Sequence, residues 1–146
     1  MGWFTRKKQA YVIDDAEVAR QMYKLAEGFI AAGAADDWHF GWDGSEVSRL
    51  DAYCDLFLGA PPEIQHSVIM TMGGYLGELM VRCGGGRWTY DPKERAAVVE
   101  MPNALRGYPH NKVAKRMKYG AEQSLAPYYH YGLTRELLPG SALTEW

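Results

Sequence analysis

The segment Gly73–Trp88, GGYLGELMVRCGGGRW, constrains the fold more than any other part of the chain. Its first half is apolar with glycines spaced through it, which predicts a helix in the core. The run Gly84–Gly86 predicts the end of that helix, and the period-two pattern that begins at Trp88 predicts a strand. We therefore expect an α+β fold that is mostly helical, with a β-hairpin packed on a glycine-rich central helix.

The size of the chain supports one domain. With 146 residues, of which 47% are apolar and 23% are charged, the chain has an ordinary globular composition. We expect a single domain over residues 1–146, with residues 1–13 as a flexible N-terminal segment. The net charge of −2 gives no general reason to expect nucleic acid or an acidic membrane as a partner.

Two helices are predicted before the central one. The first begins at Asp14 or Asp15, whose carboxylates can cap free N–H groups, and ends at Gly33 in a left-handed conformation. Its apolar stripe is Val18, Met22, Leu25 and Phe29. The second begins after Asp43, with Glu46 completing a capping box. Its stripe is Val47, Leu50, Cys54 and Phe57.

The central helix follows the break at residues 59–62 and has a wide apolar face. Its apolar positions are Ile64, Val68, Met72, Tyr75, Leu76, Leu79, Met80 and Cys83. Gly73, Gly74 and Gly77 each cost about 1 kcal/mol relative to alanine in a helix interior. We therefore expect another element to approach the helix backbone at these glycines.

The hairpin after the central helix is indicated by alternation. Trp88 and Tyr90 share one strand face, and residues 91–94, Asp-Pro-Lys-Glu, predict a type I turn. The return strand places Ala97, Val99 and Met101 on a common face, with Trp88 opposite either Ala97 or Val99. A two-stranded hairpin alone is marginally stable, so its apolar face must lie on the helices.

The remaining chain predicts a loop and short helices. Residues 102–110 are expected to be loop. Asn111 can cap a helix that ends at Gly120, and Ser124 can cap another in which Pro127 falls in the first turn. From there to residue 138 we expect broken helix.

The cysteines and the N-terminus indicate a location. Cys54 and Cys83 both fall in apolar helical patterns and form no CxxC pair, so we expect reduced, buried, unreactive thiols. No signal-peptide pattern follows the basic N-terminus, and no apolar run is long enough to span a bilayer. We expect a cytoplasmic protein.

Glu78 is the most unusual charge because it falls on an apolar helix. It could act as a general base. Alternatively, it pairs with Arg82 one turn later, or accepts hydrogen bonds from the start of the hairpin. The structural alternative is favoured, since no second carboxylate stands at a defined catalytic spacing.

Other catalytic signatures are weak. The run Gly84–Gly86 follows a helix and precedes a strand, whereas phosphate loops have the reverse order. The histidines have no zinc-ligand spacing, no serine has a nucleophile motif, and we expect neither a metal nor a cofactor. His110 could line a cleft together with Lys112, and His130 could do so with nearby tyrosines.

A basic cluster suggests a surface for nucleic acid. On a helix its residues would spread over the face opposite Val113 and Met117, with Tyr119 close by; they are Lys112, Lys115, Arg116 and Lys118. Basic residues with neighbouring aromatic rings can bind phosphates and stack bases. A solvated helix face has the same pattern, so this hypothesis ranks low.

The loop from Trp38 to Trp42 is a better interaction candidate. Its aromatic residues, Trp38, Phe40 and Trp42, either cover the core as a lid or act as anchors for a protein partner. The lid is the favoured alternative. Arg87, at the edge of the hairpin, would add to such a contact surface.

The order of several motifs resembles a known group of proteins. These motifs are residues 40–51 (FGWDGSEVSRLD), Tyr75–Glu78, Gly85–Trp88, and Pro109 followed by 112–116 (KVAKR). The chain resembles small bacterial proteins, many of them actinobacterial, in families of unknown function with a Tyr-x-Gly-Glu helix before a Gly-Gly-x-Trp strand. The resemblance implies a fold and no mechanism.

Three functional hypotheses follow. The first is a non-enzymatic protein-interaction or accessory module of a bacterial cytoplasmic assembly, which could also form a homo-oligomer. The second is a small-ligand binder or small enzyme with a site around Glu78, Arg82, Arg87 and His110. The third is nucleic-acid binding through the basic residues 112–118.

Overall fold

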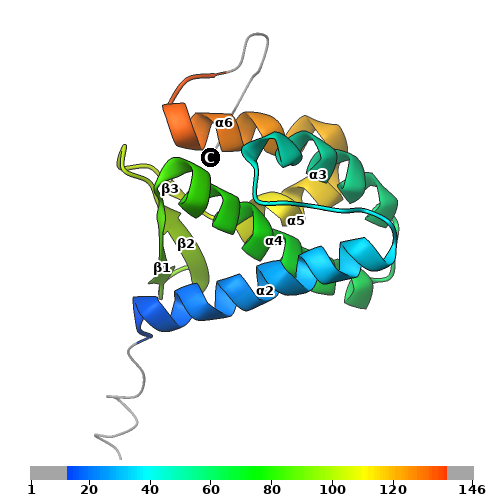
Figure 1. Ribbon diagram of the computed structural model, residues 1–146, viewed down its shortest axis with the longest axis horizontal. Coiled ribbons are helices and arrows are strands. Elements are labelled where there is room, and N and C mark those ends of the chain that lie inside the picture. The colour runs from blue at the N-terminus through cyan, green and yellow to red at the C-terminus, as the bar shows by residue number, and fades with distance from the viewer. Residues whose placement is uncertain (1–12, 138–146) are drawn as a thin grey trace, which may run out of the picture.

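The computed structural model describes residues 13–137 (Figure 1). In this range the helices are α2 (Asp15–Ala35), α3 (Val47–Cys54), α4 (Pro62–Gly84), α5 (Pro109–Tyr119) and α6 (Leu125–Thr134). The strands are β1 (Arg87–Asp91), β2 (Ala96–Glu100) and β3 (Arg106–Gly107), and short 3-10 turns cover Gly44–Glu46, Asp55–Phe57 and Gly120–Gln123. The chain is a mostly helical α+β domain, as predicted. The predicted flexible segment lies outside the described residues, except for Ile13.

Helix α2 begins as predicted and ends two residues later than predicted. The Asp14 carboxylate accepts a hydrogen bond of 3.0 Å from the N–H of Ala16. The predicted stop at Gly33 is wrong, because the helix continues to Ala35 and Asp37 takes the left-handed conformation, with a φ of 64°. Gly33 serves another purpose: a Cβ atom there would lie 2.9 Å from the carbonyl oxygen of Trp38.

Helix α4 runs through the middle of the molecule, between α2 and α6 in the view of Figure 1. Every residue from Met72 to Met80 is buried. The prediction that Ile64 and Cys83 belong to this core is wrong. Ile64 is 48% exposed and Cys83 is also exposed, because the two ends of α4 lie at the surface.

The glycines of α4 admit neighbouring elements, which confirms the expected close approach. At Gly74 a Cβ atom would lie 2.9 Å from Leu25 Cβ of α2. At Gly73 it would overlap the imidazole of His110, and at Gly77 the indole of Trp88. Three different elements therefore rest on α4 within little more than one helical turn.

The hairpin follows directly from the end of α4. Gly85, with a φ of 74°, caps the helix in the left-handed conformation, as the glycine run predicts. Trp88 pairs with Val99, one of the two predicted registers. The short strand β3, which pairs with β2 in antiparallel fashion, lies in the segment predicted as loop, because a two-residue strand has no readable alternation.

The last helices differ from prediction at their starts. Helix α5 begins at Pro109, not at Asn111, and it ends before Gly120 as predicted. Helix α6 begins at Leu125 without a side-chain cap from Ser124. The carboxylate of Asp51, on α3, accepts the Leu125 N–H at 2.8 Å instead. Among the described helices, none combines the length and apolar character needed to cross a membrane.

Candidate functional site

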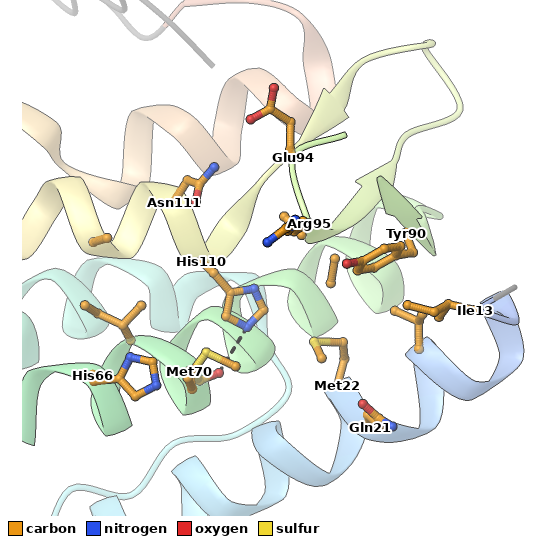
Figure 2. A pocket seen from close by; sticks show the side chains of 15 residues that line it. Ile13, Gln21, Met22, His66, Met70, Tyr90, Glu94, Arg95, His110 and Asn111 are labelled. Carbon is orange, nitrogen blue, oxygen red and sulfur yellow. Dashed lines mark hydrogen bonds between the residues drawn. The ribbon is translucent and has the colours of Figure 1, made fainter. Parts of the chain in front are cut away.

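A cavity of about 400 Å³ lies between α2, α4, the β1–β2 hairpin and α5 (Figure 2). Side chains from all four elements line it. Val18 and Met22 of α2 are buried in its wall. The other apolar lining residues are half-buried; they are Ile13, Ile69, Met70, Ala96, Ala97 and Ala114. The inner surface of the cavity is therefore mainly apolar.

The polar lining residues divide by exposure. Five are exposed; they are Gln21, His66, Glu94, Arg95 and Asn111. Two are half-buried, Tyr90 on β1 and His110 on α5. These two are the polar lining side chains that are most shielded from solvent.

His110 is held by its backbone position and by one hydrogen bond. It follows Pro109, the first residue of α5, and its ring rests on the backbone of α4 at Gly73. Its Nε2 atom lies 3.1 Å from the carbonyl oxygen of Met70, and Figure 2 shows this bond and the ring projecting towards the cavity. Burial lowers the pKa of His110 below its ordinary value of 6.5, against the opposing effect of the Met70 carbonyl. The imidazole is therefore neutral at pH 7.

The predicted partner of His110 in a cleft, Lys112, is elsewhere. Lys112 is buried, and its Nζ atom donates a hydrogen bond of 2.9 Å to Gln123 Oε1. Sequence reasoning missed Met70 and Tyr90 as parts of the site. Met70 contributes a main-chain carbonyl, for which no side-chain pattern exists. The alternation of the strand predicts only that Tyr90 shares a face with Trp88.

Glu78 lies outside the cavity and is fully engaged. It is 8% exposed. One carboxylate oxygen accepts a hydrogen bond of 3.0 Å from Trp88 Nε1, and the other lies 3.2 Å from Arg82 Nε. The Arg82 guanidinium in turn lies 3.9 Å from the centre of the Trp42 ring. This arrangement matches the structural alternative for Glu78, with Arg82 as its partner.

The residues of the predicted enzyme site do not converge. Glu78 contacts Arg82 and the indole N–H of Trp88, and the Trp88 ring centre is 6.4 Å from that of His110. Arg87 has a side chain 70% exposed and pairs with Glu100 at 2.8 Å. His110 is therefore the member of the predicted set that lines the cavity.

The aromatic loop folds onto the core. Phe40 is 6% exposed, with ring centres 5.2 Å from Phe29 and 5.5 Å from Tyr53. Trp38 and Trp42 are half-buried, and the Trp42 ring lies 5.6 Å from Tyr75. The packing matches the lid alternative. The enclosed ring of Phe40 does not present itself at the surface as the anchor alternative requires.

The basic helix does not present its charges as predicted. Arg116 is 2% exposed and donates hydrogen bonds to Asp51 Oδ1 at 3.1 Å and to Asp55 Oδ1 at 2.8 Å. Lys112 is also buried, Lys115 is half-buried, and Lys118 is exposed. The expected basic face opposite the core does not exist in this form, because α5 turns two of its four cations inward.

The cysteines and acidic residues offer little further chemistry. Cys54 is buried, and this burial raises the pKa of its thiol to about 12. Cys83 is exposed, so the prediction of two buried thiols is wrong for this residue. Within residues 13–137, no group of three His, Cys, Asp or Glu side chains is placed to hold a metal ion.

Comparisons with protein-family models, with curated proteins and with solved structures found no match.

Proposed function

We propose that the protein binds a small organic molecule in the cavity between α2, α4, the hairpin and α5. One observation carries the proposal: a cavity of about 400 Å³ with an apolar interior and an oriented histidine. Its volume falls in the range of about 300–1,000 Å³ that is common for small-molecule sites. Such sites combine apolar walls with a few placed polar groups, and this cavity has the same composition.

The walls of the cavity favour a preformed site. They come from three helices and a hairpin rather than from a long loop. Regular elements hold side chains more precisely than loops do. A ligand would therefore pay little ordering entropy on binding, which favours useful affinity for a small molecule.

The other hypotheses receive less support. A protein-interaction role relied on the aromatic loop, whose rings mostly contact the core. A nucleic-acid role relied on cations of which Lys112 and Arg116 are buried. We propose no reaction, because Glu78 is engaged outside the cavity. The cytoplasmic location expected from the sequence remains part of the proposal.

Nuclear magnetic resonance of the full, ¹⁵N-labelled chain tests the proposal. Four neutral probes are added separately: indole, benzofuran, phenol and fluorobenzene. Binding in the cavity is expected to produce saturable shift changes in the amides of Ile69, Ala97 and Asn111. Shift changes confined to other parts of the chain, or none with any probe, would overturn the proposed function.

A cavity-filling variant provides the matched comparison. Ala114→Phe places a ring in the wall of the cavity and is expected to weaken binding of every probe at least tenfold. Ala32→Phe makes the same change at an exposed position of α2 that does not line the cavity, and it is expected to leave binding unchanged. Equal effects of the two variants would contradict a site in this cavity.

A further inference from the structure

We infer that the cavity selects uncharged ligands that donate a hydrogen bond, with the Nδ1 atom of His110 as the acceptor. This inference rests on the proposed function and specifies its ligand class. Alcohols, phenols and compounds with an amide or ring N–H belong to this class. Close analogues that carry only an acceptor at the same position do not.

The hydrogen bond to Met70 fixes which ring nitrogen carries the proton. A carbonyl oxygen can only accept, so the Nε2 atom of His110, 3.1 Å away, must donate. In a neutral imidazole the other nitrogen then has no hydrogen and carries a lone pair. The Nδ1 atom of His110 is therefore an acceptor that cannot donate.

The packing of the ring directs that lone pair towards the cavity. The Cγ and Cδ2 atoms of His110 face Gly73, where even a Cβ atom would collide with them. Because this edge and Nε2 face α4, the edge formed by Nδ1 and Cε1 lies on the opposite side. Figure 2 shows this edge turned away from Met70, towards the space bounded by the hairpin.

Two features of the walls favour an uncharged ligand. Burial of an unpaired charge against apolar side chains is strongly unfavourable, and the charged lining residues, Glu94 and Arg95, are exposed to solvent. An anion would also face the lone pair of His110. Tyr90 imposes no comparable selection, because a phenol hydroxyl can either donate or accept.

Matched probe pairs test the requirement for a donor. Indole and benzofuran have nearly the same shape, but a ring N–H in indole is replaced by an oxygen in benzofuran. Phenol has a hydroxyl donor, and fluorobenzene has a fluorine atom in its place and no donor. We expect dissociation constants from amide shift titrations to be at least tenfold lower for the donor of each pair. An analogue without the donor covers the Nδ1 atom of His110 and leaves this acceptor without a partner, which weakens its binding further.

Two substitutions assign the preference to His110. His110→Gln can still donate to the Met70 carbonyl from a position close to Nε2, but it removes the ring nitrogen that faces the cavity. The tenfold preference is expected to fall below twofold. His110→Asn can restore an acceptor close to the position of Nδ1, and part of the preference is expected to return. Dispersed amide spectra show whether each variant is folded.

The possible outcomes separate the two proposals. If no probe binds in the cavity, the proposed function fails and the inference fails with it. If both members of each pair bind equally well, the site stands and the donor requirement is overturned. A donor preference that persists unchanged in a folded His110→Gln also overturns the role of His110. If His110→Gln does not fold, the wild-type comparison of the pairs still decides the donor requirement.

Discussion

The indole N–H of Trp88 donates a 3.0 Å hydrogen bond to Glu78, from the first strand back to the central helix. The bond is possible because Gly77 has no side chain, so the indole ring can lie on the helix backbone. A charged residue on an apolar helix thus serves to fix the hairpin, and Arg82 on the outer side balances its charge.

Removal of this acceptor should destabilise the protein. Glu78→Ala leaves the buried Trp88 N–H without a partner, and we expect the free energy of unfolding to fall by about 2–3 kcal/mol. Glu78→Gln keeps an oxygen acceptor and loses only an ion pair whose arginine is partly exposed, so a loss below about 1 kcal/mol is expected. Urea unfolding measures both. Equal losses in the two variants would show that Glu78 does not stabilise the protein through its hydrogen bond to Trp88.

Two glycine-to-alanine substitutions should have opposite effects. At Gly77 a methyl group would overlap the Trp88 ring, so Gly77→Ala is expected to cost about 1–3 kcal/mol through displacement of the hairpin. Gly28 lies inside α2 with no atom within 4 Å of a Cβ position. Gly28→Ala is expected to stabilise by up to about 1 kcal/mol. Melting temperatures that shift in the same direction would contradict this pair.

Asp51 and Asp55 both contact Arg116 but should differ in importance. The carboxylate of Asp51 caps α6 and pairs with a guanidinium that is 2% exposed. Asp51→Ala is expected to cost about 3–5 kcal/mol, because a buried charge loses the less exposed of its two carboxylate partners and α6 loses its cap.

Asp55, with a side chain 58% exposed, provides the matched control. Asp55→Ala is expected to cost about 1 kcal/mol or less. Chemical denaturation of the two variants in parallel gives the comparison. A larger loss at Asp55 than at Asp51 would show that the cap of α6 contributes little.

His110 should make the stability depend on pH. Its pKa in the folded protein is lowered by burial from an ordinary value of 6.5. Below pH 6.5 the unfolded chain gains a proton that the folded chain does not take up, so protons favour unfolding. The free energy of unfolding is expected to rise with pH from the lowered pKa up to about 6.5 and then to level off.

His110→Gln separates this effect from those of other groups. The difference in stability between the wild type and this variant should change between pH 5 and pH 7.5, in favour of the wild type at the higher pH. Unfolding curves at a series of pH values measure it. A difference that is constant with pH would mean that His110 is equally protonated in the folded and unfolded states.

The two cysteines should react at very different rates. Cys83 is exposed, whereas Cys54 is buried with a pKa raised to about 12. Because the thiolate is the reactive form, a chromogenic disulfide reagent is expected to titrate one thiol per folded chain and two per unfolded chain. The variant Cys83→Ser should show no rapid reaction in the folded state. Fast reaction at Cys54 would contradict its burial.

Features set by near neighbours in sequence were predictable. The start of α2 at Asp14 depends on a local cap, and the left-handed stop at Gly85 follows from a local rule. The close approach at Gly73 and Gly77 was also predictable, because a glycine inside a helix has an energetic cost that needs compensation. The sequence could not indicate that His110 and Trp88 are the residues that fill these spaces.

Features set by distant neighbours were not predictable. Lys112 and Arg116 flank the apolar residues Val113 and Met117, and a charged residue beside an apolar stripe is normally solvated. Arg116 is buried because Asp51, 65 positions earlier, supplies the compensating charge. The cavity could not be predicted from the sequence either. Its histidine, His110, is oriented by the main-chain carbonyl of Met70, and a main-chain group leaves no pattern in the sequence.

The sequence separation between Asp51 and Leu125 affects the order in which the chain can fold during synthesis. The carboxylate of Asp51 joins α3 to Leu125, 74 positions later, so the junction cannot close while α6 is still inside the ribosome. Until then the Asp51 carboxylate lacks the N–H groups of Leu125 and Ala126. The helices that precede α6 can assemble earlier during synthesis, but this junction closes only after α6 has emerged.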